Sequence, residues 1–175
     1  KLRNPEAGYA RDFVQLIEEM LPDILSNDIK IISNAGGVNA SSCSDEIVKL
    51  AAKMKGRSAP VGIIEGDDIL DRMDDLYRSG VSFENMDTGE SFESIKDKVY
   101  SANAYISSFS IKEALSKGAR IVLAGRVSDP GLALGPMLYE YGWKETDYNL
   151  LAAGTLAGHI TECGAQCTGG NYTRW

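Results

Sequence analysis

The amino-acid sequence predicts an α/β protein with a mostly parallel sheet and helices on both faces, a Rossmann-like arrangement of three layers. Two observations support this class. Short runs of β-branched and aliphatic residues alternate with longer stretches in which apolar residues recur every three or four positions, the pattern of strands connected by helices. In addition, most of the short runs end in a turn that contains glycine or aspartate.

The first half of the chain predicts a helix, a strand and a second helix. Apolar side chains recur at helical spacing through residues 9–26, where Pro22 could kink the helix or split it in two. Residues 29–33 are rich in isoleucine and predict a short buried strand. A glycine-rich turn over residues 34–39 then leads into a helix predicted for residues 44–54.

The second half repeats this alternation and adds one longer excursion. Residues 99–107 have strand character, and residues 82–94 predict a surface loop. Gly118 marks the end of a short helix, and Asp129 followed by Pro130 predicts the start of another. The remaining predicted elements are strands over residues 60–64 and 120–124 and helices over residues 69–77, 110–117 and 130–141.

Composition limits the classes of function. The chain has 175 residues, of which 43% are hydrophobic, and this predicts a single α/β domain over residues 1–175. The net charge of −7 argues against nucleic-acid binding, which depends on clustered lysine and arginine. No apolar run approaches the ~20 residues that span a bilayer, and the cysteines lack a paired spacing. We therefore expect a reduced, cytoplasmic protein that binds neither nucleic acid nor membrane.

Ligands of such folds bind beyond the carboxyl ends of the strands, where three loops are predicted to meet. The first loop could hold a phosphate or carboxylate on its backbone amides, with Asn34, Gly36, Gly37 and Asn39 as binding residues. This loop matches neither the dinucleotide fingerprint nor the P-loop pattern. A tight turn without a ligand is the alternative interpretation.

The other two loops carry charged residues. Arg126 directly follows a predicted strand and could bind a carboxylate or phosphate through two hydrogen bonds. Alternatively, Arg126 forms an ion pair with Asp129 that only holds the loop. Glu65, Asp67 and Asp68 offer oxygen ligands for Mg²⁺, although acidic residues at this position more often favour the start of a helix.

Residues 158–170 hold the only histidine and two of the three cysteines. His159, Cys163 and Cys167 recur every four residues, but on a helix the first and last would lie about 12 Å apart, too far to share a zinc ion. We therefore assign no metal. His159 and Glu162 would share a helix face and could act as a general base, and Cys163 could be a nucleophile if its pKa is lowered. A buried Cys163 that acts as a small apolar residue is the alternative.

Taken together, these segments resemble the acyclic terpene utilisation protein family. The resemblance spans residues 4–170 and depends on four motifs in a fixed order. They are Ser33-Asn-Ala-Gly-Gly-Val-Asn39, Gly125-Arg-Val-Ser-Asp129 with Leu134-Gly135-Pro136, Tyr139-Glu140-Tyr141-Gly142-Trp143, and Gly158-His159 through Glu162-Cys-Gly-Ala-Gln166 to Thr168-Gly-Gly170. The family is longer, and its N-terminal Gly-Phe-Trp-Gly-Asp-Ser-like segment has no counterpart here. The chain is therefore expected to be a fragment that lacks both termini.

The resemblance implies a role in the catabolism of acyclic terpenes such as citronellol and geraniol, at the level of a carboxylate or acyl-CoA intermediate. We expect an enzyme of lyase or hydrolase type that uses acid–base chemistry on a small anionic substrate, with its cofactor unknown. The alternative is a non-catalytic ligand-binding or assembly subunit of a carboxylase-type pathway complex. The glycines could also serve close contact between subunits of a homo-oligomer. The predicted catalytic residues are His159, Glu162 and Cys163, and the predicted substrate-binding residues are Asn34, Gly36, Gly37, Asn39, Arg126, Asp129 and Gln166.

Overall fold

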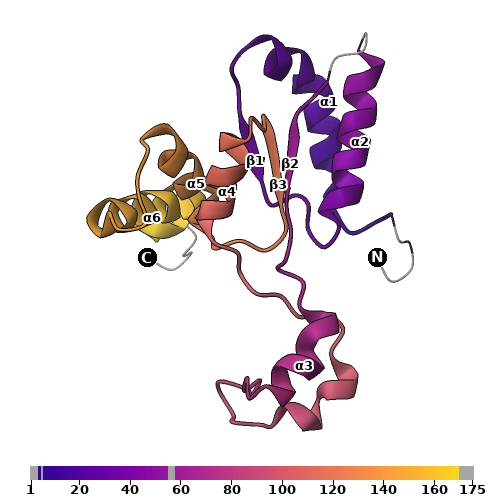
Figure 1. Cartoon of the computed structure of the whole chain (residues 1–175), viewed down its shortest axis with the longest axis vertical. Coiled ribbons are helices and arrows are strands. Elements are labelled where there is room, and N and C mark those ends of the chain that lie inside the picture. Colours follow the sequence, from indigo (N-terminus) through magenta and orange to yellow (C-terminus); the bar gives the residue numbers. More distant parts are fainter. Residues whose placement is uncertain (1–3, 5, 55–57, 170–175) are drawn as a thin grey trace.

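The computed structural model, which describes residues 4, 6–54 and 58–169, has a three-stranded parallel sheet at its centre. The strands are β1 (Ile31–Ser33), β2 (Val61–Ile64) and β3 (Ile121–Ala124), and their order in the sheet is β1-β3-β2. Helices cover both faces of this sheet (Figure 1). The predicted α/β class is therefore confirmed.

The central strand β3 separates two apolar cores. All of its residues are buried, which fits its position between two neighbours and two helical layers. Side chains alternate along a strand, so Ile121 and Leu123 belong to the core on one face, and Val122 and Ala124 to the core on the other.

The first face is covered by α1 (Arg11–Ser26) and α2 (Ala40–Lys53), which confirms two predicted helices. Helix α1 continues through Pro22. Helix α2 begins four residues before its predicted start, because the Asn39 side chain accepts a hydrogen bond from Ser42 N at 3.3 Å and caps it. The buried apolar residues of these two helices are Ile17, Leu21, Ile24, Ala40, Cys43, Ile47 and Ala51.

The second face is covered by α4 (Ser108–Ser116) and α5 (Gly131–Glu140). Ile111 and Leu115 of α4 are fully buried in the core of this face. Helix α5 lies close to α4, because a Cβ atom at Gly135 would stand 2.5 Å from Ile111 Cβ. The predicted start of α5 is wrong by one residue: Pro130 is at the cap position, and Asp129 is an exposed turn residue without a capping role.

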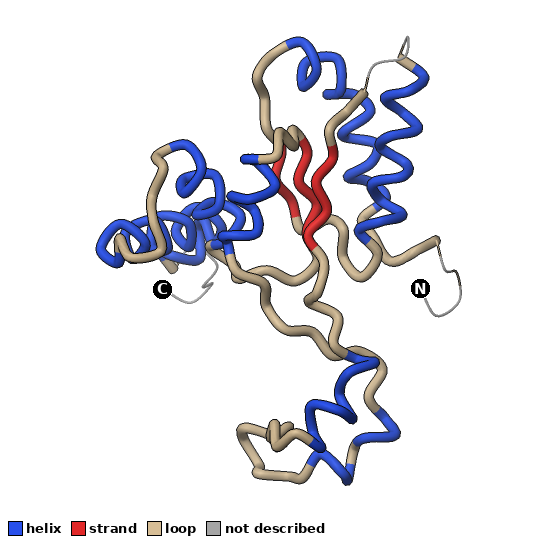
Figure 2. The backbone as a smooth tube through the Cα atoms, viewed as in Figure 1, coloured by secondary structure: helices blue, strands red, loops and turns tan. Residues whose placement is uncertain are grey.

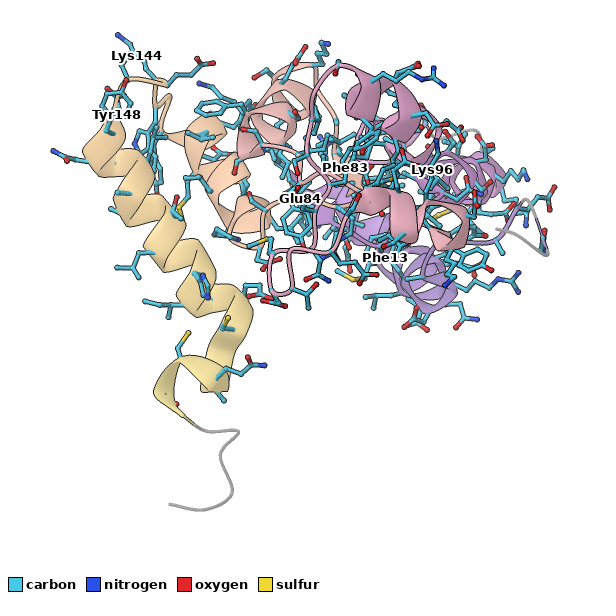
Figure 3. All side chains as sticks on the ribbon, turned by 90° about the horizontal axis from the view of Figure 1, so that it is seen from below. Phe13, Phe83, Glu84, Lys96, Lys144 and Tyr148 are labelled. Atoms are coloured by element: carbon cyan, nitrogen blue, oxygen red, sulfur yellow. The ribbon has the colours of Figure 1, made fainter. Side chains whose placement is uncertain are left out.

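Helix α6 (Tyr148–Cys163) packs on α5 and is an element that the sequence analysis did not predict as a whole. It runs along one side of the molecule, with Tyr148 at its start (Figure 3). Gly154 and Gly158 are its buried residues, and a Cβ atom at Gly158 would lie 2.7 Å from Pro130 O. Within this chain, both glycines therefore serve the close approach of α6 to α5.

An arm, residues 69–102, projects from the body of the molecule on a stalk made of residues 65–68 and 103–107 (Figures 1 and 2). The arm contains α3 (Met73–Arg78) and short 3-10 turns at Leu70–Arg72, Phe92–Ser94 and Lys96–Lys98. Phe92 is 3% exposed and contacts the rings of Tyr77 and Phe83, each at a centroid distance of 5.2 Å. The predicted surface excursion over residues 82–94 lies in this arm.

The strand predicted for residues 99–107 is wrong. These residues form the returning limb of the stalk and make two isolated bridges, an antiparallel one between Asp68 and Asn103 and a parallel one between Ile106 and Val127. Tyr100 and Tyr105 are 77% and 59% exposed, so the β-favouring side chains are not covered by a neighbouring layer. Strand propensity reflects packing on a half-buried surface, and this segment lacks that surface.

Among the helices that the structure describes, none is both long and apolar enough to cross a lipid bilayer.

Replacing Leu123 with alanine is expected to lower the free energy of unfolding by about 2–5 kcal/mol, because this side chain is fully buried in the central strand. Leu16→Ala is the matched control: Leu16 is half-exposed on α1, and its loss should cost less than about 1 kcal/mol. Urea denaturation followed by circular dichroism measures both values. Equal losses for the two variants would contradict the assignment of the core.

Candidate functional site

A pocket of about 340 Å³ lies at the carboxyl ends of the three strands. Residues after β1 and in the first turn of α2 form one wall, residues after β2 form the opposite wall, and Gly125 after β3 lies between them. The lining residues are Gly37, Val38, Asn39, Ala40, Ser41, Ile64, Glu65, Gly66, Asp67, Asp68 and Gly125. The structure thus brings together the three loops that the sequence analysis singled out.

A larger hollow, of about 450 Å³, runs along the free edge of β2 and is bordered by α4. It is lined by strand backbone and by the ion-paired side chains Glu113 and Lys117. We place the candidate site in the smaller pocket, because parallel sheets bind ligands beyond the carboxyl ends of their strands.

Asp67 is the most buried charged group of the pocket, with 7% of its surface exposed. Its Oδ2 atom accepts hydrogen bonds from Arg126 N at 2.9 Å and from Asn103 Nδ2 at 3.0 Å. Gly125 makes room for this carboxylate, because a Cβ atom there would lie 2.5 Å from Oδ2. Both of these donors use Oδ2, which makes Oδ1 the candidate acceptor for a molecule in the pocket.

The remaining acidic residues of the pocket have local partners. Glu65 accepts a hydrogen bond from Ser41 Oγ at 3.1 Å, and Asp68 Oδ1 accepts one from Leu70 N at 3.1 Å. No group of three histidine, cysteine, aspartate or glutamate side chains in the described ranges is arranged to hold a metal ion. The structure thus offers no support for the Mg²⁺ alternative at Glu65, Asp67 and Asp68.

The glycine-rich loop after β1 uses its amides within the chain. Gly37 N donates to Asn34 O at 3.1 Å, Val38 N donates to Gly8 O at 2.9 Å, and Asn39 N donates to Gly36 O at 2.9 Å. The Val38 bond holds the loop against the segment that precedes α1, and the other two bonds close turns within the loop, so these three amides do not form an open cradle.

Two glycines of this loop have packing roles. A Cβ atom at Gly36 would lie 2.8 Å from Ala124 O, at the end of the central strand. Gly37 has a φ of +54°, and a side chain there would clash with the carbonyl oxygen of Gly8. Amides for an anionic ligand are therefore to be sought in the first turn of α2, where Ala40 and Ser41 line the pocket.

Arg126 is held at both its backbone and its side chain. Its guanidinium lies over the ring of Tyr105 at 4.9 Å, and Nη2 donates a hydrogen bond to the Tyr105 hydroxyl at 2.6 Å. The described partner of Arg126 is thus Tyr105, not the Asp129 that the sequence analysis considered. Arg126 is exposed and directly follows Gly125, but it is not among the residues that line the pocket.

The predicted catalytic residues lie on the last turns of α6, outside the pocket lining. His159 and Glu162 are exposed, and Gln166 is exposed in the short 3-10 helix Gly164–Thr168 that follows. The contact of Gly158 with Pro130 nevertheless places this end of α6 near the loop that follows β3. The motif residue Gly170 lies outside the described residues.

The Cys163 thiol donates a hydrogen bond to Glu162 Oε2 at 3.1 Å. This hydrogen bond, with a smaller effect of desolvation, raises the pKa of Cys163 to about 11. A nucleophilic cysteine needs a lowered pKa. The thiol is therefore protonated at neutral pH, and the condition set for a nucleophilic role is not met in this structure.

Sequence reasoning missed Asn103 and Tyr105, which hold Asp67 and Arg126. Asn103 is 36 residues from Asp67, and Tyr105 is 21 residues from Arg126. No local pattern links residues so far apart, and both sit in a segment that was predicted as a strand. Asp67 itself was considered, but only as a metal ligand or a helix-start residue.

Comparison with known proteins adds one finding. The family model described as "Acyclic terpene utilisation family protein AtuA" matches residues 1–175. No curated protein and no solved structure was found to be significantly similar to the chain. The match covers the sheet, the pocket, the arm and α6 alike.

Gly125→Ala is expected to destabilise the protein by about 1–3 kcal/mol, because the added methyl group meets the buried carboxylate of Asp67. In an Asp67→Ala background that carboxylate is absent, so the same substitution should cost less than about 1 kcal/mol. Unfolding free energies of the two single variants and the double variant give the coupling. Strictly additive losses would show that the two residues are not packed against each other.

Proposed function

Because the chain belongs to the acyclic terpene utilisation family, we propose that it serves the breakdown of acyclic terpenes or related branched-chain acids by binding their CoA thioesters. The binding site in this proposal is the pocket at the carboxyl ends of the strands. The acid–base chemistry expected from the sequence belongs to the same proposal and is treated separately below.

The buried carboxylate of Asp67 is the observation from which we infer the class of ligand. It lines the pocket together with Glu65 and Asp68, so a small molecule whose only polar group is a carboxylate would meet like charge. A CoA thioester instead presents hydroxyl and amide donors, which match an acceptor such as Asp67 Oδ1. Of the two substrates considered, we therefore choose the thioester, because it offers such donors and the ionised free acid does not.

The opposite wall supports binding of the anionic part of the thioester. Ala40 and Ser41 begin α2, and the first amides of a helix have no hydrogen-bond partner within it. These amides and the helix dipole favour a phosphate group. Arg126, the residue after Gly125, is the nearest cation in the sequence, although its guanidinium is held on Tyr105. In this proposal, the wall that contains Asp67 accepts hydrogen bonds from the ligand, and the wall at the start of α2 binds its phosphate groups.

The volume of the pocket limits how much of a thioester it can enclose. At about 340 Å³ it is at the lower end of ligand pockets, which span roughly 300–1,000 Å³. It accommodates one portion of the molecule, and the rest extends past the mouth. An acyl group that leaves the pocket beside Gly125 would pass toward Pro130, against which the end of α6 packs.

This path gives His159 and Glu162 a role as acid–base groups outside the pocket.

The second candidate, a subunit that binds the thioester without converting it, is favoured by one observation. Within the described chain, the residues that line the pocket include neither histidine nor cysteine. Turnover separates the two candidates.

Ser41→Asp is expected to weaken binding of the CoA thioester of geranic acid by roughly tenfold, because a negative charge would oppose the phosphates at the start of α2. Aspartate is favourable in the first turn of a helix, but it would also replace the hydroxyl that donates to Glu65 and would face that carboxylate, so the unfolding free energy of each variant is measured as well. Ser41→Ala is the control without charge. Isothermal titration calorimetry with the thioester, free CoA and free geranic acid measures the effect. Equal affinity of Ser41→Asp and wild type, or tighter binding of the free acid, would contradict the proposed site.

His159→Ala and Glu162→Ala are expected to reduce turnover of the bound thioester by about 10²–10⁴-fold while its affinity changes little, since both residues lie outside the pocket lining. The measurement is product formation by liquid chromatography, with affinities taken from calorimetry. Unchanged turnover in both variants would remove these residues from the mechanism. Binding by the wild type without any product would favour the binding subunit.

A further inference from the structure

The base of the arm and the wall of the pocket share one carboxylate. Asp67 lies in the outgoing limb of the stalk and lines the pocket. Its Oδ2 accepts a hydrogen bond from Asn103 on the returning limb and another from Arg126 N on the body of the molecule. The limbs are also joined by Ala104 N, which donates to Asp67 O at 2.7 Å.

The arm is held together by its own contacts. Phe92 packs between Tyr77 and Phe83, and Lys96 forms an ion pair with Asp74 at 2.8 Å. The outgoing limb turns at Gly66, whose φ of +108° strongly favours glycine. A self-contained unit on two narrow limbs can turn as a body about those limbs. The bonds of Asp67, together with the bridge between Ile106 and Val127, tie the limbs to the body.

We propose that Asn103 is a positioning residue of the pocket, and that its hydrogen bond to Asp67 couples the orientation of the arm to the occupancy of the pocket. This proposal rests on the proposed function, since it takes Asp67 to contact the bound thioester. A ligand that bonds to Oδ1 fixes the carboxylate, and a fixed carboxylate holds Asn103 and the returning limb. Coupling between sites is reciprocal, so a change at the returning limb also alters affinity in the pocket.

The first test needs no ligand. Amide hydrogen exchange measured by nuclear magnetic resonance on the 175-residue chain compares wild type with Asn103→Ala and Asn103→Asp. The amides of Arg126 and Ala104 are expected to exchange about tenfold faster in Asn103→Ala, the effect of losing one hydrogen bond to a charged group. Asn103→Asp keeps the size of the side chain but repels Asp67, so its effect should be larger.

Asn85→Ala is the matched control. Asn85 lies in the arm, where its side chain accepts hydrogen bonds from Asp87 N and Thr88 N, away from the stalk. This variant should leave the exchange of the Arg126 and Ala104 amides unchanged. An Arg126 amide that responds to neither Asn103 variant, or that responds equally to Asn85→Ala, overturns the coupling.

The second test adds the CoA thioester of geranic acid. In wild type, binding should slow exchange of the Ile69 amide, which donates to Ala102 O at 2.9 Å and lies outside the pocket lining. Asn103→Ala should lose this response and bind the thioester about tenfold more weakly. If the wild type binds the thioester and Ile69 does not respond, the coupling is overturned and the proposed function stands. If the wild type binds no thioester, the proposed function fails, and the ligand-free comparison still decides whether Asn103 positions Asp67.

Discussion

The structure depends on one buried carboxylate and on the absence of a side chain opposite it. Asp67 occupies the space that Gly125 leaves open, and its bonds reach partners 36 and 59 residues away in the sequence. A buried charge is tolerated only when it is hydrogen-bonded, so these partners must stay in place. The Asp67 carboxylate therefore links the loop after β2 to both the loop after β3 and the returning limb of the stalk.

Other glycines in the molecule also leave space for a close contact, because they lack the side chain that would keep two elements apart. Gly36 brings the first loop against the end of β3, Gly135 brings α5 against α4, and Gly158 brings α6 against Pro130. The glycine-rich motifs that suggested binding sites are in large part packing motifs. Their effect on the pocket is indirect, because they set how closely the loops around it can approach one another.

Elements that bury a continuous apolar surface could be predicted from the sequence, and elements without such a surface could not. The periodicity of residues 9–26 and the isoleucine-rich run before Ser33 correspond to α1 and β1. Helix α1 buries one face in a core, and Ile31 of β1 packs, half-buried, against the same core. Residues 99–107 carry strand-favouring side chains but meet no neighbouring layer. Helix α6 buries glycines instead of large apolar residues, so its inner face gives no hydrophobic signal.

The sequence by itself determined the class of the fold, the family and the three loops at which a ligand site could form. These follow from local spacing and from motifs in a fixed order. Only the tertiary structure decided that Asp67 is buried in the wall of the pocket, that Asn103 bonds to it, and that His159 lies on a separate helix. The reason is physical. Apolar residues that bury one face of a helix or strand recur at a regular spacing, which can be seen in the local sequence. The partners of a buried charge come from distant segments and meet only when the chain packs.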